Sequence, residues 1–375
     1  MNRRLASNFL LYKGALMRNG VVEVDSAGRI LSVSSAEDID SLPYTEFFSG
    51  IMMPAMVNAH CHLELSYLKG AITERCGFAS FAQQMSAVRR TFEPSDIERA
   101  ITRADLELYN GGVGAVGDIS NSSDSFDVKR RSRVYYHTFV EHFGLGRTSA
   151  DYLEPLLAME HSSLTPHSTY SVLEAPLRHI AGRGEAPLSI HFMETAAEAE
   201  LFEGRGEMYE WYQQMGFECD FLHYKSPAQR LVSTIPASRS VMLVHNTAVS
   251  EADIDLIMSH FTAPVYWVVC PLSNRYISGA EPPVEMLARK GLNICIGTDS
   301  LASNSSLSML AEIAAMPSLP LAQRLDWATR VGAQALGLDD MGEIEVGKCP
   351  GLVVMSGVDV ARGEIGDKCM INRII

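Results

Sequence analysis

The middle of the chain, residues 51–340, alternates short apolar runs with amphipathic segments, and this alternation constrains the fold more than any other feature. The apolar runs have the length of strands, whereas the amphipathic segments have helical spacing. Strands are expected at Ala55–His60, Ala115–Ser120, Val134–Glu141, Ser168–Val172, Leu188–Phe192, Val241–His245, Val265–Cys270 and Ile294–Gly297. Helices are expected at Phe81–Thr91, Pro94–Tyr109, Ala196–Met215, Glu251–His260, Val284–Lys290, Ser306–Met316 and Leu321–Leu336. This order indicates an α/β protein with a parallel sheet.

Two architectures accommodate such an order. Seven or eight βα units in this stretch of chain suit a TIM (β/α)8 barrel, for which about 250 residues are typical. The alternative is an open, doubly wound sheet. It is disfavoured because no Gly-rich phosphate-binding loop follows the first expected strand.

The two ends of the chain consist of short strand-like runs separated by turn residues such as Asn19-Gly20 and Ala27-Gly28. Neither end is long enough to bury a core of its own, so we expect the two ends to pair with each other. The predicted domains are therefore a small β-sandwich made of residues 1–50 and 341–375, and a barrel made of residues 51–340.

Charge and cysteine usage exclude several classes of protein. The formal net charge is −14, which repels a phosphate backbone and argues against a nucleic-acid partner. The seven cysteines form no C-x-x-C motif, which argues against a disulfide framework or a cysteine zinc site. The apolar runs are too short to span a bilayer, and no secretory signal is recognised at the N-terminus. We therefore expect a cytoplasmic protein that acts on a small molecule and has no membrane partner.

The motif Val57-Asn58-Ala59-His60-Cys61-His62 is the first sign of chemistry. Residues two apart on a strand point the same way, so His60 and His62 can face one ion. Imidazole suits zinc or another first-row metal. On its own the H-x-H pair is weak, because two buried neutral histidines arise easily by chance.

Further ionisable residues follow other expected strands. His191, His245 and Asp299 stand at strand ends, and Glu194 comes three residues after His191. The strands of a parallel barrel deliver their C-terminal ends to one rim, where such residues gather. Each has an ordinary explanation by itself, such as helix capping for Asp299. These four residues, together with the His60/His62 pair at the first strand, indicate a site.

Three imidazoles and one carboxylate leave an open position at which a divalent metal can activate water. Asp299 can take a proton while touching the metal. Glu194 is three residues after His191, so on a strand the two side chains would point to opposite faces. We therefore expect Glu194 just beyond the end of the strand, where it can carry a proton to the substrate. His245 is expected to hold the attacking oxygen or to polarise the reaction centre.

An ordered set of motifs resembles the amidohydrolase superfamily, specifically its cytosine deaminase/chlorohydrolase branch of adenosine-type deaminases and triazine hydrolases. These motifs run from GIMMP and NAHCHLE through TPH, IHFMETAAE and CPLSN to GTDSLASNSSLSMLAE and ATRVGAQALGLDDMGEIEVGK. The resemblance covers nearly the whole chain. It implies a distorted TIM barrel with a β-sandwich formed by both chain ends, and relatives of this kind are often homodimers.

The same resemblance implies one divalent metal, zinc first and iron or manganese as alternatives, bound by His60, His62, His191 and Asp299. Glu194 corresponds to the proton shuttle, and His245 to the residue that assists the water. Binuclear members of the superfamily use a carboxylated lysine on a barrel strand. The expected strand VYYHTFVEH has no lysine, which supports a single metal.

Two departures bear on the substrate. Leu272 stands where an arginine is frequent, so a polar contact to the substrate is expected to be missing. Glu64, in HLELS, and the later Gly77-Phe78 and Phe81 look most like aminodeoxyfutalosine deaminases. Glu64 could bind ribose hydroxyls, or it could be an ordinary loop carboxylate. His167 could contact the substrate, or it could be a surface histidine.

The leading interpretation is a metal-dependent hydrolytic deaminase of an amino-heterocycle such as an adenosine-like nucleoside. A second is hydrolysis of chloro- or alkylamino-substituted rings or of cyclic amides, for which the metal chemistry is the same. A third is a non-catalytic binding protein on the same fold. The segments Tyr67–Thr91 and Asn121–Val128 are expected to set specificity, but they carry no motif that names the substrate.

Overall fold

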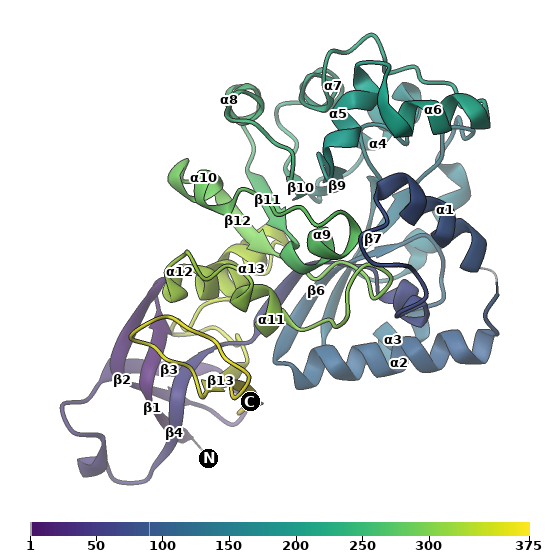
Figure 1. Cartoon of the computed structure of the whole chain (residues 1–375). Helices are drawn as coiled ribbons and strands as arrows, with labels where there is room; N and C mark the ends of the chain where they lie inside the picture. Colours follow the sequence, from purple (N-terminus) through teal and green to yellow (C-terminus); the bar gives the residue numbers. More distant parts are fainter. Residues whose placement is uncertain (1, 90) are drawn as a thin grey trace.

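The computed structural model describes residues 2–89 and 91–375. Figure 1 shows a sheet that carries both chain ends beside a larger part in which helices surround parallel strands. The sheet consists of β1 (Arg3–Tyr12), β2 (Ala15–Val24), β3 (Ile30–Ser35), β4 (Thr45–Pro54), β13 (Leu352–Ser356) and β14 (Met370–Arg373), in the order β14-β13-β4-β1-β2-β3. β13 pairs antiparallel with β4, so the two ends of the chain share one six-stranded sheet.

This sheet has its own apolar cluster and runs directly into the larger part. Buried side chains of β1, β2 and β4, including Leu5, Val22 and Met52, pack together. Its strands are longer than the sequence runs suggested. β4 continues past residue 50 to Pro54, so the predicted domain boundary falls inside a strand.

The larger part contains eight parallel strands. They are β5 (Met56–Cys61), β6 (Val113–Ser120), β7 (Tyr135–His142), β8 (Ser162–Pro166), β9 (Leu188–Phe192), β10 (Val241–His245), β11 (Val265–Val269) and β12 (Asn293–Ile296). They form two four-stranded sheets, β5-β6-β7-β8 and β12-β11-β10-β9. Single parallel bridges, Cys61 with Asp299 and Ser168 with His191, link the sheets at both junctions. Their C-terminal ends therefore meet at one place.

Seven of the eight strands lie within two residues of their predicted positions, and one prediction is wrong. Ser168–Val172 is not a strand; β8 lies earlier, at Ser162–Pro166. The chain turns after β8, where Ser168 Oγ accepts hydrogen bonds from the backbone N–H groups of Tyr170 and Ser171. The prediction failed because β8 has the mixed sequence SSLTP and lacks an apolar run.

The helices are α1 (Phe78–Val88), α2 (Pro94–Asn110), α3 (Phe126–Arg131), α4 (Glu174–Ala181), α5 (Ala196–Phe202), α6 (Gly206–Met215), α7 (Pro227–Thr234), α8 (Glu251–His260), α9 (Pro271–Ile277), α10 (Val284–Arg289), α11 (Met309–Ala314), α12 (Leu321–Asp326) and α13 (Gly332–Ala335). A π-helical turn, Trp327–Val331, joins α12 to α13. Short 3-10 turns occur at Ile39–Ser41, Leu63–Leu68 and Asp151–Ala158.

Three helix predictions need correction. The single helix expected over Ala196–Met215 is two helices, because Gly204 and Gly206 have φ of +69° and +83° and break it. The helix expected at Phe81–Thr91 begins earlier, at Phe78, and ends at Val88; Arg90 in that range lies outside the described residues. The short helices α3, α4, α7 and α9 were not predicted, because each spans only two turns or so.

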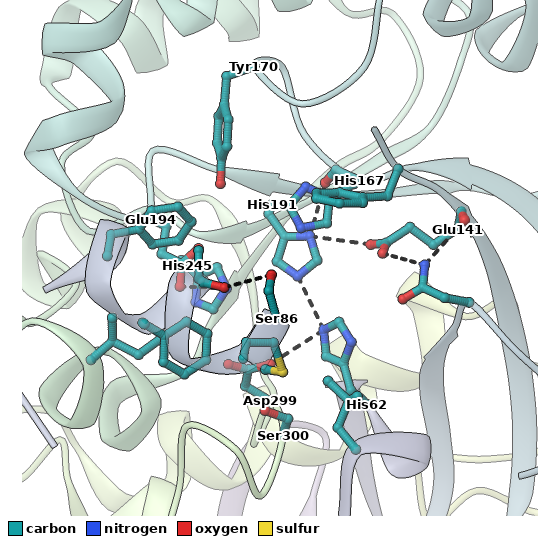
Figure 2. Close-up of a pocket in the computed structure, with 18 of the residues that line it drawn as sticks. His62, Ser86, Glu141, His167, Tyr170, His191, Glu194, His245, Asp299 and Ser300 are labelled. Carbon is teal, nitrogen blue, oxygen red and sulfur yellow. Dashed lines mark hydrogen bonds and ion pairs between the residues drawn. The ribbon is translucent and has the colours of Figure 1, made fainter. Parts of the chain in front are cut away.

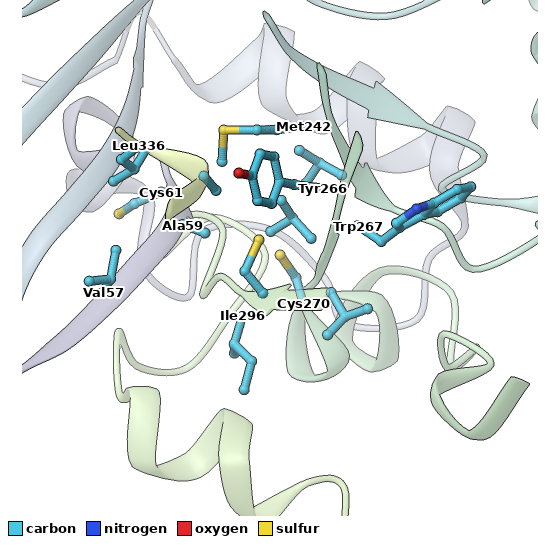
Figure 3. Close-up of a cluster of buried hydrophobic side chains, with 14 of the residues drawn as sticks. Val57, Ala59, Cys61, Met242, Tyr266, Trp267, Cys270, Ile296 and Leu336 are labelled. Atoms are coloured by element: carbon cyan, nitrogen blue, oxygen red, sulfur yellow. The ribbon is translucent and has the colours of Figure 1, made fainter. Parts of the chain in front are cut away.

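Apolar side chains from β5, β10, β11 and β12 pack beside the strand ends and hold them in place. Figure 3 shows Val57, Ala59 and Cys61 of β5 near Leu336, with Met242 and Tyr266 close by. Gly297 follows β12, and a Cβ there would lie 2.8 Å from both Cβ and O of His60. Only glycine allows β12 to approach β5 this closely. Among the described residues, no helix is long and apolar enough to cross a membrane.

Candidate metal centre and active site

Four side chains from three strand ends converge on one point. His60 Nε2 lies 3.2 Å from His62 Nε2, which lies 3.2 Å from His191 Nε2. Asp299 Oδ1 lies 3.6 Å from His60 Nε2 and 3.4 Å from His62 Nε2. A tetrahedral zinc site with bonds of 2.0–2.1 Å has ligand atoms ~3.3 Å apart, so these separations match a shared ion.

The protonation of the histidines fits the same ion. Burial, together with the neighbouring histidines, lowers the pKa of His62 well below its usual value, and burial lowers that of His191 to about 4. Both rings are therefore neutral and can offer a lone pair. His191 Nδ1 donates a hydrogen bond to the backbone oxygen of His167 at 2.9 Å, which leaves the Nε2 lone pair directed at the centre. The donor set thus fits a divalent cation.

Backbone strain places two of the site residues. His245 ends β10 with φ of +82°, and Asp299 follows β12 with φ of +58°. Such values are uncommon outside glycine and concentrate at functional sites. They turn both side chains away from the strand direction and toward the centre.

Glu194 lies just past the end of β9, as expected, and is buried. Met193 before it has φ of +47°, so the chain turns at this point. Burial, with the charges of Asp299 and Glu198, raises the pKa of Glu194 well above its usual value. Glu198 Oε2 accepts the backbone N–H of Glu194 at 3.2 Å and fixes its position. A carboxyl group held in its protonated form can deliver a proton.

His245 faces Glu194. Asn274 Nδ2 donates to His245 Nδ1 at 3.3 Å, so the proton of the neutral ring is on Nε2. That Nε2 is buried, has no hydrogen-bond partner in the described parts of the chain, and lies 3.7 Å from Glu194 Oε1. The ring therefore presents an N–H group to whatever occupies the centre.

A cavity of about 220 Å³ opens over these residues. Figure 2 shows His62, His191, Glu194, His245 and Asp299 around it. Its outer wall is largely apolar and comes from two helices that follow different strands: Phe78, Phe81, Ala82 and Met85 from α1, and Trp211 and Tyr212 from α6. The cavity is thus a reaction centre at one end and an apolar pocket at the other.

The two residues predicted to bind substrate occupy different positions. His167 lines the cavity and stacks on His191, with ring centroids 4.4 Å apart. Glu64 is buried and is not part of the cavity lining. Its Oε1 accepts hydrogen bonds from Arg89 and the Asn121 backbone, and its Oε2 accepts two from Ser122. The structure therefore supports a contact position for His167 and a bracing position for Glu64.

Sequence reasoning missed Glu141 and Tyr170, which both line the cavity and are buried. Glu141 is the last residue but one of β7, beside His142, and the run VYYHTFVEH was considered only for its missing lysine. The position of Glu141 after an apolar strand was the signal that could have found it. Tyr170 lies in the turn that was taken for a strand.

Comparison with known proteins agrees with this geometry. The amidohydrolase family model matches residues 51–372, and the chain belongs to this family. An adenosine deaminase of Helicobacter pylori is 30% identical over 329 residues, covering 80% of this chain and 78% of that protein. The crystal structure of an H. pylori aminofutalosine deaminase with methylthio-coformycin has a TM-score of 0.80 at 25% identity and covers 94% of this chain and 92% of that one.

An adenosine deaminase from Xanthomonas campestris with bound zinc has the same fold, with a TM-score of 0.73 at 24% identity and coverage of 95% and 85%. The protein is thus a hydrolase of the amidohydrolase superfamily, with a His/Asp cluster whose geometry suits a metal ion and with deaminases of adenosine-like substrates among its relatives.

Proposed function

We propose that this protein is a hydrolytic deaminase of an adenosine-like nucleoside and works with one divalent metal, zinc first, held by His60, His62, His191 and Asp299. The observation that carries the proposal is the convergence of these four ligand atoms beside a buried carboxyl group, Glu194. The similarity to an aminofutalosine deaminase supports a substrate of that type, with a bulky group on the sugar beyond the amino-purine.

The reaction replaces the exocyclic amino group of the ring with an oxygen from water and releases ammonia. A divalent ion at this site lowers the pKa of water, so that a nucleophile is available near neutral pH. Glu194 donates its proton to the ring nitrogen next to the amino-bearing carbon, which makes that carbon electrophilic. Asp299 accepts one proton of the attacking water and passes it to the departing amine, and the proton left on the added oxygen returns to Glu194 as the ring carbonyl forms. His245 donates from Nε2 to the oxygen that adds to the ring.

The apolar wall made by α1 and α6 supports a substrate larger than a free base. A purine ring alone would leave the wall uncovered, whereas a nucleoside with an apolar 5′ substituent would bury it. We also interpret the two four-stranded sheets as the halves of a distorted (β/α)8 barrel, with residues 1–50 and 341–375 forming the second, β-sandwich domain.

The test is ammonia release from a panel by the zinc-loaded protein, with mass analysis of the product. The panel holds adenosine, 5′-methylthioadenosine, S-adenosylhomocysteine, aminodeoxyfutalosine, cytosine, a chloro-triazine and a cyclic amide. We expect turnover of the nucleosides with a mass gain of one unit for each –NH2 replaced by –OH, and the highest kcat/KM for a nucleoside with a 5′ extension. Turnover of the triazine or the cyclic amide alone would reject the proposal. Glu194→Gln, loaded with the same metal, serves as the control for contaminating deaminases.

A further inference from the structure

The cavity contains a second buried carboxylate that the deamination chemistry does not use. Glu141 is the last residue but one of β7, is 2% exposed and lines the cavity. Its Oε2 accepts a hydrogen bond from Asn121 Nδ2 at 2.9 Å. Its Oε1 is buried and has no hydrogen-bond partner among the described residues. A buried carboxylate oxygen without a donor carries a large desolvation cost, which a bound ligand would offset.

His191, the nearest candidate donor to Oε1 of Glu141, already donates its hydrogen bond elsewhere. Oε1 of Glu141 lies 3.6 Å from Nδ1 of His191, which is too long for a hydrogen bond. That Nδ1 donates instead to the backbone oxygen of His167, at 2.9 Å. The free oxygen of Glu141 is therefore left for the contents of the cavity.

The position of Glu141 relative to the reaction centre decides which part of a ligand it can meet. His191 presents Nε2 to the metal ligands and Nδ1 to Glu141, so Glu141 lies one imidazole ring beyond the centre. In Figure 2, Glu194 and Glu141 lie to either side of His191. A purine whose amino-bearing carbon meets Glu194 carries its sugar at the opposite end of the ring system, away from Glu194.

Glu141 is also held in place from behind. Glu64 accepts the backbone N–H groups of Asn121 and Ser122, at 3.0 Å each. Asn121 in turn donates its side-chain amide to Glu141, to Oε2 and to the backbone oxygen. Glu64, which the sequence suggested as a ribose-binding residue, thus holds the loop that contains Asn121. That loop in turn supports Glu141, which faces the cavity.

We infer that Glu141 accepts hydrogen bonds from the 2′ and 3′ hydroxyls of the substrate sugar through its free Oε1, and that Glu64 is a positioning residue acting through Asn121. This inference rests on the proposed function and adds the residue by which a ribonucleoside is selected over its deoxy forms. Burial raises the pKa of Glu141 to about 8, and hydrogen bonds from both members of a vicinal diol would favour its charged form, in which the contact is charge-assisted.

The test compares adenosine with 2′,3′-dideoxyadenosine in the zinc-loaded wild type and in Glu141→Gln. We expect the wild type to favour adenosine in kcat/KM by about 10- to 100-fold, the worth of a hydrogen bond to a charged group. The preference should fall about tenfold in Glu141→Gln, because the amide oxygen is retained by Asn121 and the acceptor in the cavity is lost. In Glu141→Leu the preference for adenosine over the dideoxy substrate should disappear.

Glu312→Gln is the matched control. Glu312 is fully buried near the same strand ends, bonds to Asn304 and to the backbone of Leu272, and does not line the cavity. Its variant should keep the wild-type preference, whatever happens to its overall rate. Binding of the product pair inosine and 2′,3′-dideoxyinosine, followed by calorimetry, should show the same loss of discrimination without turnover. Zinc content, measured on every variant, should stay at one per chain.

Three results would overturn the inference while leaving deamination intact. They are equal wild-type rates on the two substrates, an unchanged preference in Glu141→Leu, and an equal loss of rate on both substrates accompanied by loss of zinc. The last would make Glu141 a support for His191. Absence of deamination with every nucleoside would instead reject the proposed function, and the inference with it.

Discussion

Ser273 donates a hydrogen bond from Oγ to Oδ2 of Asp299 at 2.6 Å, and this contact decides which oxygen of Asp299 faces the histidines. Ser303 donates to the same oxygen, also at 2.6 Å. Oδ1 is therefore the oxygen that turns toward His60 and His62. The carboxylate of Asp299, a proposed metal ligand, is fixed here by two hydroxyls, that of Ser273 in α9 and that of Ser303 in the turn after β12.

We predict that Ser273→Ala weakens metal binding about 10- to 100-fold, the usual effect of removing a group that orients a metal ligand. Titration of the metal-free protein with zinc against a chelating indicator measures the dissociation constant. Ser278→Ala, at the exposed end of the same helix, is the control and should bind zinc as the wild type does. Equal zinc affinity in Ser273→Ala would show that Ser303 alone holds Asp299.

Substitutions at Glu194 and Asp299 should distinguish a loss of proton transfer from a loss of bound metal. Glu194→Gln keeps every ligand atom, so we expect normal zinc content and normal thermal stability with a fall in kcat of about two to four orders of magnitude. Asp299→Asn removes the charged ligand, so we expect turnover to be abolished and zinc to be lost on dialysis. Elemental analysis beside the ammonia assay makes the comparison. Near-normal turnover in Glu194→Gln would assign proton transfer to another group.

Gly297 should be intolerant of a single added methyl group. An alanine Cβ would lie 2.8 Å from Cβ and O of His60, so either β12 or the metal ligand must move. We expect Gly297→Ala to destabilise the protein by about 1–3 kcal/mol, the usual cost of overpacking, and to reduce zinc affinity. Urea unfolding of the metal-free protein and zinc titration measure the two effects. Gly146→Ala, which meets no atom within 4 Å, should change neither.

Buried carboxyl groups should make the metal-free protein less stable as the pH rises. Burial raises the pKa of Glu312 from 4.5 to about 8, so the folded state holds this proton over a range in which the unfolded state has lost it. Unfolding therefore releases protons between about pH 4.5 and 8, and stability falls with rising pH across that window.

Glu312→Gln cannot ionise and should flatten this dependence. The melting temperatures of the metal-free wild type and Glu312→Gln are measured from pH 5 to 8.5. The difference between the two proteins should be smaller at pH 8.5 than at pH 5. Parallel curves would mean that the carboxyl group of Glu312 stays charged in the folded protein.

The strand ends were predictable because β10 is an apolar run that ends in a histidine, β9 is a mostly apolar run with His191 next to its end, and the H-x-H motif lies at the end of β5. Parallel strands must deliver these ends to one rim, so the meeting of His60, His191 and His245 follows from period and order alone. β8 escaped prediction because a strand with the sequence SSLTP carries no hydrophobic period. Its parallel pairing with β7, a tertiary contact, defines it.

The division of labour between Glu64 and Glu141 could not be predicted. Both residues lie near the end of a buried strand, and sequence spacing cannot tell a carboxylate that faces a cavity from one that faces the backbone of a neighbouring loop. The difference lies in the course of residues 121–122, which bring three hydrogen-bond donors to Glu64 and none to Oε1 of Glu141. Positive φ at Asp299 and His245 is equally invisible in a sequence without glycine at those positions.

The helices α1 and α6, which wall the outer part of the cavity, belong to the excursions after β5 and β9 and supply none of the ligand atoms at the centre. Replacing the side chains of these two helices would therefore change which substituent of the substrate fits the cavity. The hydrolysis at the centre would not change. Enzymes that share this arrangement can therefore change their substrate range through α1 and α6 and keep the same hydrolytic reaction.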